Sequence, residues 1–152
     1  MAPNLELKVP PPLVLVAVAA AMWGLAGLGP RLLLPGTSVI GVGLMLAGLA
    51  LNLAGVAAVR HAKTTFNPLR PETATALVST GLFGLTRNPM YLGMLLVLVG
   101  WAVYLAAPVA LLGPVAFVLY ITRFQIIPEE RALAKLFGEG FAEYRAKVRR
   151  WL

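Results

Sequence analysis

The chain has 152 residues, of which 59% are hydrophobic and only 12% are charged, and its mean hydropathy is +0.82. Soluble domains usually carry about 25% charged residues, so this composition indicates an integral membrane protein. The chain has no cysteine, no aspartate and a single histidine, His61, which argues against disulfides, a metal site, a Ser-His-Asp triad and two-carboxylate hydrolysis. The net charge of +7 does not favour nucleic acid, because the basic residues flank apolar segments and suit a cytoplasmic membrane surface.

Two apolar segments fill the first part of the chain. Between Lys8 and Arg31 there are 22 uncharged residues, enough for one spanning helix at about 20 residues per crossing. This run is too long for the apolar part of a cleaved signal, so we expect a retained first span. After a short turn, a second span is predicted over about 38–59, and the helical spacing of Gly48 and Gly55 predicts a close packing face.

A polar stretch, residues 60–88, follows the second span. Pro68 and Pro71 deny it a long regular helix. Because long loops in compact proteins tend to be functional, we expect it to contribute to a site. Three of its polar side chains are expected to satisfy the backbone of its turns: Thr64, Thr65 and Asn67.

A helical hairpin is predicted next. Between Arg87 and Arg123 there are 35 uncharged residues, too many for one span, and Pro108 interrupts them. We therefore predict two spans, over 89–106 and 109–127. The hairpin brings the end of its second helix back to the side where the first began.

The tail, residues 128–152, is predicted to be amphipathic. Apolar and aromatic residues recur in it at three- and four-residue steps: Leu133, Leu136, Phe137, Phe141, Tyr144, Val148 and Trp151. We expect the tail to lie along the membrane interface, split by Gly138 and Gly140 into two helical pieces. Trp101 is expected to face lipid or the interface, and Trp151 to anchor the tail there.

Positive charge predicts the orientation. Seven lysines and arginines lie from Arg123 onward and four lie in the 60–88 loop, whereas Arg31 is alone in the outer turns. We therefore expect four spans, with both termini and the 60–88 loop cytoplasmic. The predicted fold is an all-α integral membrane domain, with an N-terminal two-span hairpin in 1–59 and a second region, 60–152, that carries the site.

Two short motifs place charge where the chain passes between water and lipid, which costs free energy unless the charge is used. The first is Arg87-Asn88-Pro89-Met90-Tyr91. A helix beginning at Pro89, with Asn88 as N-cap, turns its free N–H groups toward the interface, where they favour an anion. Arg87 adds a cationic fork suited to a carboxylate or phosphate. Simple anchoring of the helix to lipid phosphates is the alternative.

The second motif is the acid pair Glu129-Glu130, where the hairpin ends. Two adjacent positions on a helix point about 100° apart. We therefore expect one carboxylate to face a ligand hydroxyl pair or ammonium and the other to orient a neighbour such as Arg87 or Arg123. A helix N-terminal acid pair that only satisfies the helix dipole is the alternative.

Taken with their surroundings, these motifs resemble the isoprenylcysteine carboxyl methyltransferase and phospholipid methyltransferase family. The resemblance rests on Thr80-Gly81-Leu82-Phe83, on Arg87-Asn88-Pro89-Met90-Tyr91-Leu92-Gly93, and on Glu129-Glu130 followed by Leu133, Phe137, Gly138 and Tyr144. It implies a membrane enzyme that transfers a methyl group from S-adenosylmethionine to a hydrophobic, membrane-resident acceptor, with no metal.

The resemblance also implies which residues form the site. Those implied for S-adenosylmethionine binding are Gly81, Phe83, Arg87, Asn88, Pro89, Tyr91, Glu129 and Glu130. Those implied for catalysis are Glu130, Arg123 and Tyr91.

Three positions depart from the family pattern. Asn88 replaces a histidine, and Phe83 replaces a tyrosine. Gln125 stands where the carboxyl methyltransferases have an arginine, four residues before the acid pair. The acceptor group is therefore open among a carboxylate, an amine, a hydroxyl and a thiol.

Two other functions remain open. Distant folds of this kind include sterol reductases that bind NADPH, although the 60–88 loop offers few basic residues for that larger cofactor. A non-catalytic structural membrane protein also fits. A transporter is disfavoured, because no charge lies between Arg87 and Arg123.

Overall fold

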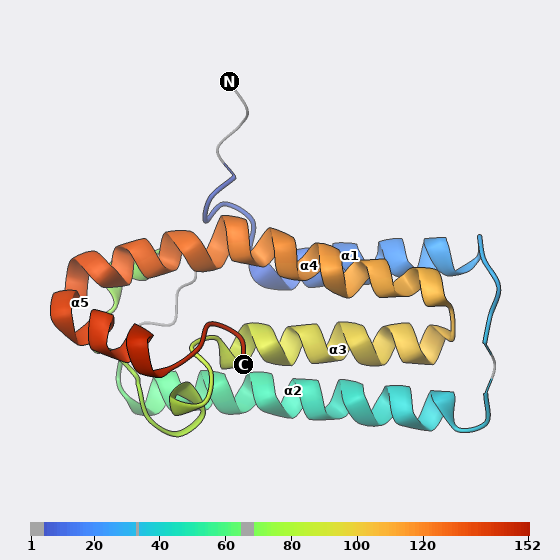
Figure 1. Cartoon of the computed structure of the whole chain (residues 1–152), viewed down its shortest axis with the longest axis horizontal. Helices are drawn as coiled ribbons and strands as arrows, with labels where there is room; N and C mark the ends of the chain where they lie inside the picture. The colour runs from blue at the N-terminus through green and yellow to red at the C-terminus, as the bar shows by residue number, and fades with distance from the viewer. Residues whose placement is uncertain (1–4, 33, 65–68) are drawn as a thin grey trace.

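A computed structural model describes residues 5–32, 34–64 and 69–152, and in these ranges the regular structure is helical, with no strand. The five main helices are α1 (Pro11–Ala26), α2 (Thr37–His61), α3 (Pro89–Leu105), α4 (Leu112–Ile121) and α5 (Ile127–Lys147). The short elements are the 3-10 turns η1 (Pro71–Thr73), η2 (Gly81–Gly84) and η3 (Pro108–Leu111) and the π-helical turn η4 (Thr122–Ile126). Helices α1 to α4 run side by side, and α5 lies at the end of the bundle where α2 finishes and α3 begins (Figure 1).

Two helical runs in the described residues are long and apolar enough to cross a membrane. One is α2, with 25 residues, and the other is the 40-residue run Pro108–Lys147, which contains α4 and α5. Helices α1 and α3 are apolar but shorter, with 16 and 17 residues. The all-α prediction is therefore confirmed, and the four-span arrangement stays a prediction.

Helices α2 and α3 approach each other through facing glycines. A Cβ placed on Gly48 would lie 2.6 Å from the carbonyl oxygen of Gly93, and one on Gly41 would lie 2.8 Å from that of Gly100. A Cβ on Gly55 would lie 2.7 Å from a side chain in the first turn of α3. The packing face predicted from Gly48 and Gly55 is confirmed, and it brings the two backbones close together.

The largest apolar core lies among α1, α3 and α4. Met22, Leu98 and Phe117 are fully buried in it. Trp101, which we expected at the lipid surface, is half-buried against this core, and its indole N–H donates to the carbonyl oxygen of Ala19 (3.0 Å). The indole therefore ties α3 to α1.

Helix α4 continues into α5 through η4, so the helix predicted over 109–127 does not end at residue 127. Pro128 has no N–H, and the carbonyl of Phe124 therefore lacks its α-helical donor. The backbone N–H of Leu7 donates to that carbonyl at 3.0 Å, which satisfies it from outside the helix. The tail does bend at Gly138 (φ 49°, ψ −120°), as predicted, whereas Gly140 is helical.

Candidate functional site

A pocket lies where the end of α2, the start of α3, both parts of α5 and the 60–88 loop meet. The cavity measures about 150 Å³, a size at which an apolar cavity holds one benzene-sized ring. Its walls are mainly apolar: Val59, Pro71, Ala74, Ala76, Leu77, Val78, Phe83, Met90, Ile126, Leu133 and Phe141. Its polar lining residues are Thr64, Arg87, Asn88, Tyr91, Glu129, Glu130 and Tyr144.

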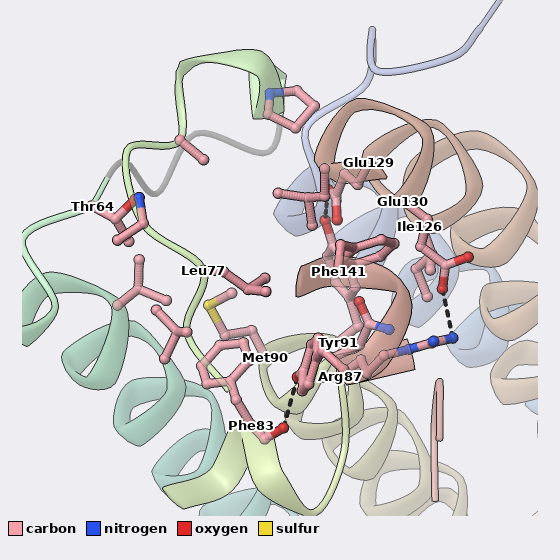
Figure 2. Close-up of a pocket in the computed structure, with 18 residues that line it drawn as sticks. Thr64, Leu77, Phe83, Arg87, Met90, Tyr91, Ile126, Glu129, Glu130 and Phe141 are labelled. Atoms are coloured by element: carbon pink, nitrogen blue, oxygen red, sulfur yellow. Dashed lines mark hydrogen bonds and ion pairs between the residues drawn. The ribbon is translucent and has the colours of Figure 1, made fainter. Parts of the chain in front are cut away.

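Helices α3 and α5 meet in the pocket through Tyr91 and Glu129. The buried Tyr91, in the first turn of α3, donates its hydroxyl to Glu129 Oε1 at 2.5 Å (Figure 2). Glu129 lies in the first turn of α5 and is partly buried. In the described part of the chain, its other oxygen, Oε2, has no hydrogen-bond donor. Because a carboxylate taken out of water needs donors or a cation, Glu129 is suited to accept a hydrogen bond from a ligand in the pocket.

Glu130 faces away from Glu129 and joins two arginines. Arg87 Nη2 lies 2.9 Å from Glu130 Oε1, and Arg150 donates through Nε to Oε1 (3.0 Å) and through Nη2 to Oε2 (2.8 Å). Burial lowers the pKa of Arg87, and the hydrogen bond to Glu130 raises the pKa of Arg150. Both guanidiniums remain cationic at neutral pH. The two acids thus have different partners, as adjacent helical positions require.

One nitrogen of the Arg87 side chain is buried without a hydrogen-bond partner among the described residues. The amide N–H of Arg87 donates to the carbonyl of Arg149 (3.0 Å) and its Nη1 to the carbonyl of Arg145 (3.4 Å). The unpaired nitrogen is Nε. The side chain is only 9% exposed and lines the pocket. An unpaired buried donor costs free energy, and this one belongs to a guanidinium group that lines the pocket.

The 3-10 turn η2 supplies an aromatic wall. Gly81 begins η2 with φ +60°, a value that favours glycine, and does not line the pocket itself. Phe83, in the same turn, is buried and lines the pocket. The Tyr144 hydroxyl donates to the Phe83 carbonyl at 2.6 Å, which fixes η2 against α5 (Figure 2).

Asn88 occupies the N-cap position of α3 and Pro89 the first helical position, as predicted. The Asn88 side chain makes no cap hydrogen bond, and its Nδ2 donates to the carbonyl of Arg150 at 2.9 Å. Asn88 lines the pocket, whereas Pro89 does not. The asparagine at the position of the family's histidine therefore holds a backbone segment in place.

Arg123 and Gln125 lie away from the pocket. Arg123, with 58% of its side chain exposed, binds Glu6 at 2.6 Å. Gln125 is fully buried in η4 and donates to the carbonyl of Val9 at 2.7 Å. Both residues bind the segment before α1, and the structure does not bring Arg123 together with the other predicted site residues.

Comparison with known proteins gives the family. Residues 37–140 match the phospholipid methyltransferase family. The chain belongs to that family. Protein-S-isoprenylcysteine O-methyltransferase B of Arabidopsis thaliana is 30% identical over 114 residues, which are 73% of this chain and 56% of the plant protein. Protein-S-isoprenylcysteine O-methyltransferase of Xenopus laevis is 32% identical over 117 residues, 73% of this chain and 38% of that protein.

A further relative is an uncharacterized protein of Haemophilus influenzae. It is 46% identical over 63 residues, which are 41% of this chain and 100% of that protein. The chain spans about half the length of the plant methyltransferase it matches. The site residues Arg87, Tyr91, Glu129 and Glu130 all lie within the stretch that matches the phospholipid methyltransferase family.

Sequence reasoning missed part of this family member's site. Arg150 was not singled out, although a basic pair directly after the amphipathic repeat was a visible signal. The apolar wall from Ala74 to Val78 has no motif that could have revealed it. Thr64 Oγ1 accepts from the N–H groups of Thr75 and Ala76, as expected of a turn residue. Two further residues that we expected to support turns lie outside the described residues: Thr65 and Asn67.

Within the described ranges, no group of three or more His, Asp or Glu side chains is placed to hold a metal ion. The polar groups that line the pocket are two carboxyl groups, one guanidinium, an amide and hydroxyls.

Proposed function

We propose that this member of the methyltransferase family uses S-adenosylmethionine to methylate a hydrophobic acceptor resident in the bilayer. One observation carries the proposal. The hydrogen-bonded pair Tyr91–Glu129 and the side chain of Arg87 line one largely apolar pocket. The names of the plant and frog relatives support methyl transfer, and the acceptor of this chain is our inference.

The side chains that line the pocket suit the chemical groups of S-adenosylmethionine. Arg87 would pair with its carboxylate, because a guanidinium with a free donor matches a carboxylate. Glu129 would accept from the ribose hydroxyls or the ammonium. Phe83 would stack on the adenine. The rest of the molecule would then lie in the mouth of the pocket. Asn88 would form part of its wall, and Gly81 and Pro89 would act indirectly by positioning the neighbouring residues that line it.

When bound, S-adenosylmethionine supplies a methyl group on a sulfonium. The chain's own residues position the reactants and exclude water, which is what such a displacement mainly needs. The Tyr91 hydroxyl fixes the orientation of Glu129, leaving its second oxygen for a ligand donor or for the proton of the acceptor group. Glu130 acts indirectly, because both of its oxygens are held by arginines.

Four membrane crossings are part of the proposal. Outward-facing side chains of α2 are large and apolar, including Val39, Ile40, Leu46, Leu49 and Leu53. Since α1, α3 and α4 are roughly parallel to α2 in the same bundle (Figure 1), they would share the same slab of lipid. The arginine and lysine distribution favours a cytoplasmic 60–88 loop and cytoplasmic termini. The acceptor would then enter sideways from the bilayer, and the charged face of α5 would lie at the interface.

Calorimetry on detergent-purified protein tests the cofactor. S-adenosylhomocysteine and NADPH are titrated into the wild type, Arg87→Ala, Glu129→Gln and the control Arg149→Ala, whose side chain is exposed. We expect S-adenosylhomocysteine to bind the wild type and the control, and to bind Arg87→Ala and Glu129→Gln about 10- to 100-fold more weakly. NADPH binding without S-adenosylhomocysteine binding would support a reductase. A folded wild type that binds neither would favour a non-catalytic protein.

A further inference from the structure

Residues 148–151, which we call the closing segment, run from the end of α5 back to the start of α3. Helix α5 ends at Lys147, and Val148 is extended (φ −119°, ψ 131°). The red end of the chain in Figure 1 lies beside the first turn of α3. The closing segment falls outside the stretch that matches the phospholipid methyltransferase family, which ends at residue 140.

The backbone of the closing segment is held against the turn before α3. The Arg150 carbonyl accepts from Asn88 Nδ2 (2.9 Å) and from Thr86 Oγ1 (3.3 Å). The Arg149 carbonyl accepts from the N–H of Arg87 (3.0 Å). The Trp151 indole N–H donates to Thr122 Oγ1 (3.3 Å). None of these contacts uses the Arg150 side chain, so they would survive its truncation.

The Arg150 side chain has a separate partner. Its guanidinium forks onto both oxygens of Glu130, at 3.0 and 2.8 Å. A two-point contact of this kind fixes the plane of a carboxylate as well as its position. The fixed carboxylate directs Oε1 at Nη2 of Arg87, 2.9 Å away. Without Arg150, Glu130 would be free to rotate about its last side-chain bond.

The charge count at this edge of the pocket favours an anion. Two guanidinium groups, those of Arg87 and Arg150, share the single carboxylate of Glu130. Arg87 is 9% exposed and Glu130 12%, so solvent screens their interaction little. The unpaired Nε of Arg87 belongs to the guanidinium that Glu130 orients.

We propose that Arg150 is a positioning residue that sets how tightly the pocket holds a ligand carboxylate. It fixes Glu130, Glu130 orients Arg87, and Arg87 binds the carboxylate. This proposal rests on the proposed function, because it takes the ligand to be an S-adenosyl amino acid. It also separates the two acids, since Glu129 faces the ligand and Glu130 does not touch it.

Two ligands that differ by one group test the proposal. S-adenosylhomocysteine carries the carboxylate, and S-adenosyl-3-thiopropylamine lacks only that group. Their dissociation constants are measured by calorimetry for the wild type, Arg150→Ala, Arg150→Lys and Arg149→Ala. Arg149→Ala removes the same charge from the neighbouring, exposed position. The unfolding temperature of each variant is recorded in the same detergent.

We expect Arg150→Ala to weaken S-adenosylhomocysteine binding about tenfold and to change binding of the thiopropylamine less than about twofold. Arg150→Lys, which keeps the charge but loses the fork, is expected to lie between wild type and Arg150→Ala. Arg149→Ala is expected to change neither constant.

Equal weakening of both ligands by Arg150→Ala would overturn the proposal and leave Arg150 as a support of the fold. Unchanged binding of both ligands would overturn it as well. A folded wild type that binds neither ligand would overturn the proposed function together with this proposal. Loss of carboxylate discrimination in Arg149→Ala would assign the effect to net charge instead of to the fork.

Discussion

The hydroxyl of Tyr91 donates to the carboxylate of Glu129 at 2.5 Å, although the two residues are 38 positions apart. Tyr91 lies in the first turn of α3 and Glu129 in the first turn of α5. The contact closes the helical hairpin at its polar end and leaves one carboxylate oxygen toward the pocket. The same hydrogen bond therefore stabilises the packing of α3 against α5 and orients a carboxyl group of the candidate site.

Removing the Tyr91 hydroxyl is expected to destabilise the protein. Tyr91→Phe leaves a partly buried carboxylate without its donor, which costs about 1–2 kcal/mol. Glu129→Gln keeps an acceptor oxygen and is expected to cost less than about 1 kcal/mol. Because the residues are in contact, the double variant should cost less than the sum of the two. Unfolding in detergent measures all three, with Tyr104→Phe, at a half-exposed ring, as control. If the losses in unfolding free energy of the two single variants simply added in the double variant, Tyr91 and Glu129 would not be directly coupled.

A methyl group at the α2–α3 contact is expected to push the helices apart. A Cβ on Gly93 would lie 2.6 Å from the Gly48 carbonyl oxygen and 2.7 Å from the Asn52 backbone nitrogen. Overpacking of this kind costs about 1–3 kcal/mol, so Gly93→Ala should lower the unfolding temperature. Gly43→Ala is the matched control, because nothing lies within 4 Å of its Cβ, and it should stabilise by about 0.5–1 kcal/mol. Equal unfolding temperatures for the two variants would disprove the close contact.

The bend in α5 depends on Gly138. Its φ of 49° with ψ of −120° is a conformation that costs other residues about 1–3 kcal/mol. Gly138→Ala should therefore destabilise the protein and displace Phe141 and Tyr144 from the pocket wall, which weakens S-adenosylhomocysteine binding. Gly140→Ala, at a helical position with open space around it, should leave binding unchanged. Calorimetry with unfolding curves checks both, and intact binding in Gly138→Ala would show that the bend is dispensable.

The segment before α1 is expected to loosen in acid. A hydrogen bond from Arg123, with a second from Arg131, holds the pKa of Glu6 below its usual value. A lowered folded-state pKa contributes stability above the unfolded value, near about 4.3, and that stability is lost as the pH falls through the folded pKa. The gap in unfolding temperature between wild type and Glu6→Gln should thus be present at pH 7 and close below about pH 4. A gap that is constant with pH would mean that Glu6 acts through packing.

Much of the fold could be predicted from local pattern. The lengths of the uncharged runs located α2 and α3, and Pro89 marked the start of α3 correctly, because proline is preorganised for a first helical turn. Gly48 and Gly55 predicted the α2–α3 contact. The divergence of Glu129 from Glu130 follows from the helical rotation per residue.

Contacts between distant segments could not be predicted in this way. The second helix of the hairpin was predicted to end at residue 127, but α4 continues through η4 into α5, and Leu7, distant in sequence, supplies the N–H that Pro128 lacks. The resemblance assigned Arg123 to catalysis. In the structure Arg123 is exposed and pairs with Glu6, away from the pocket. Arg150 pairs with Glu130 only because the closing segment folds back toward α3. A local periodicity in the sequence cannot predict such a long-range contact.

The contact between Leu7 and the Phe124 carbonyl also bears on biogenesis. Residues 6 and 123, which pair beside it, are 117 positions apart, so the ribosome makes the first partner long before the second. If the helices enter the membrane in sequence order, residues 6 and 7 cannot form these contacts until α4 and η4 have been synthesised. Docking of residues 6 and 7 onto η4 would then be a late step in folding, because it requires α4 and η4 to be already in place.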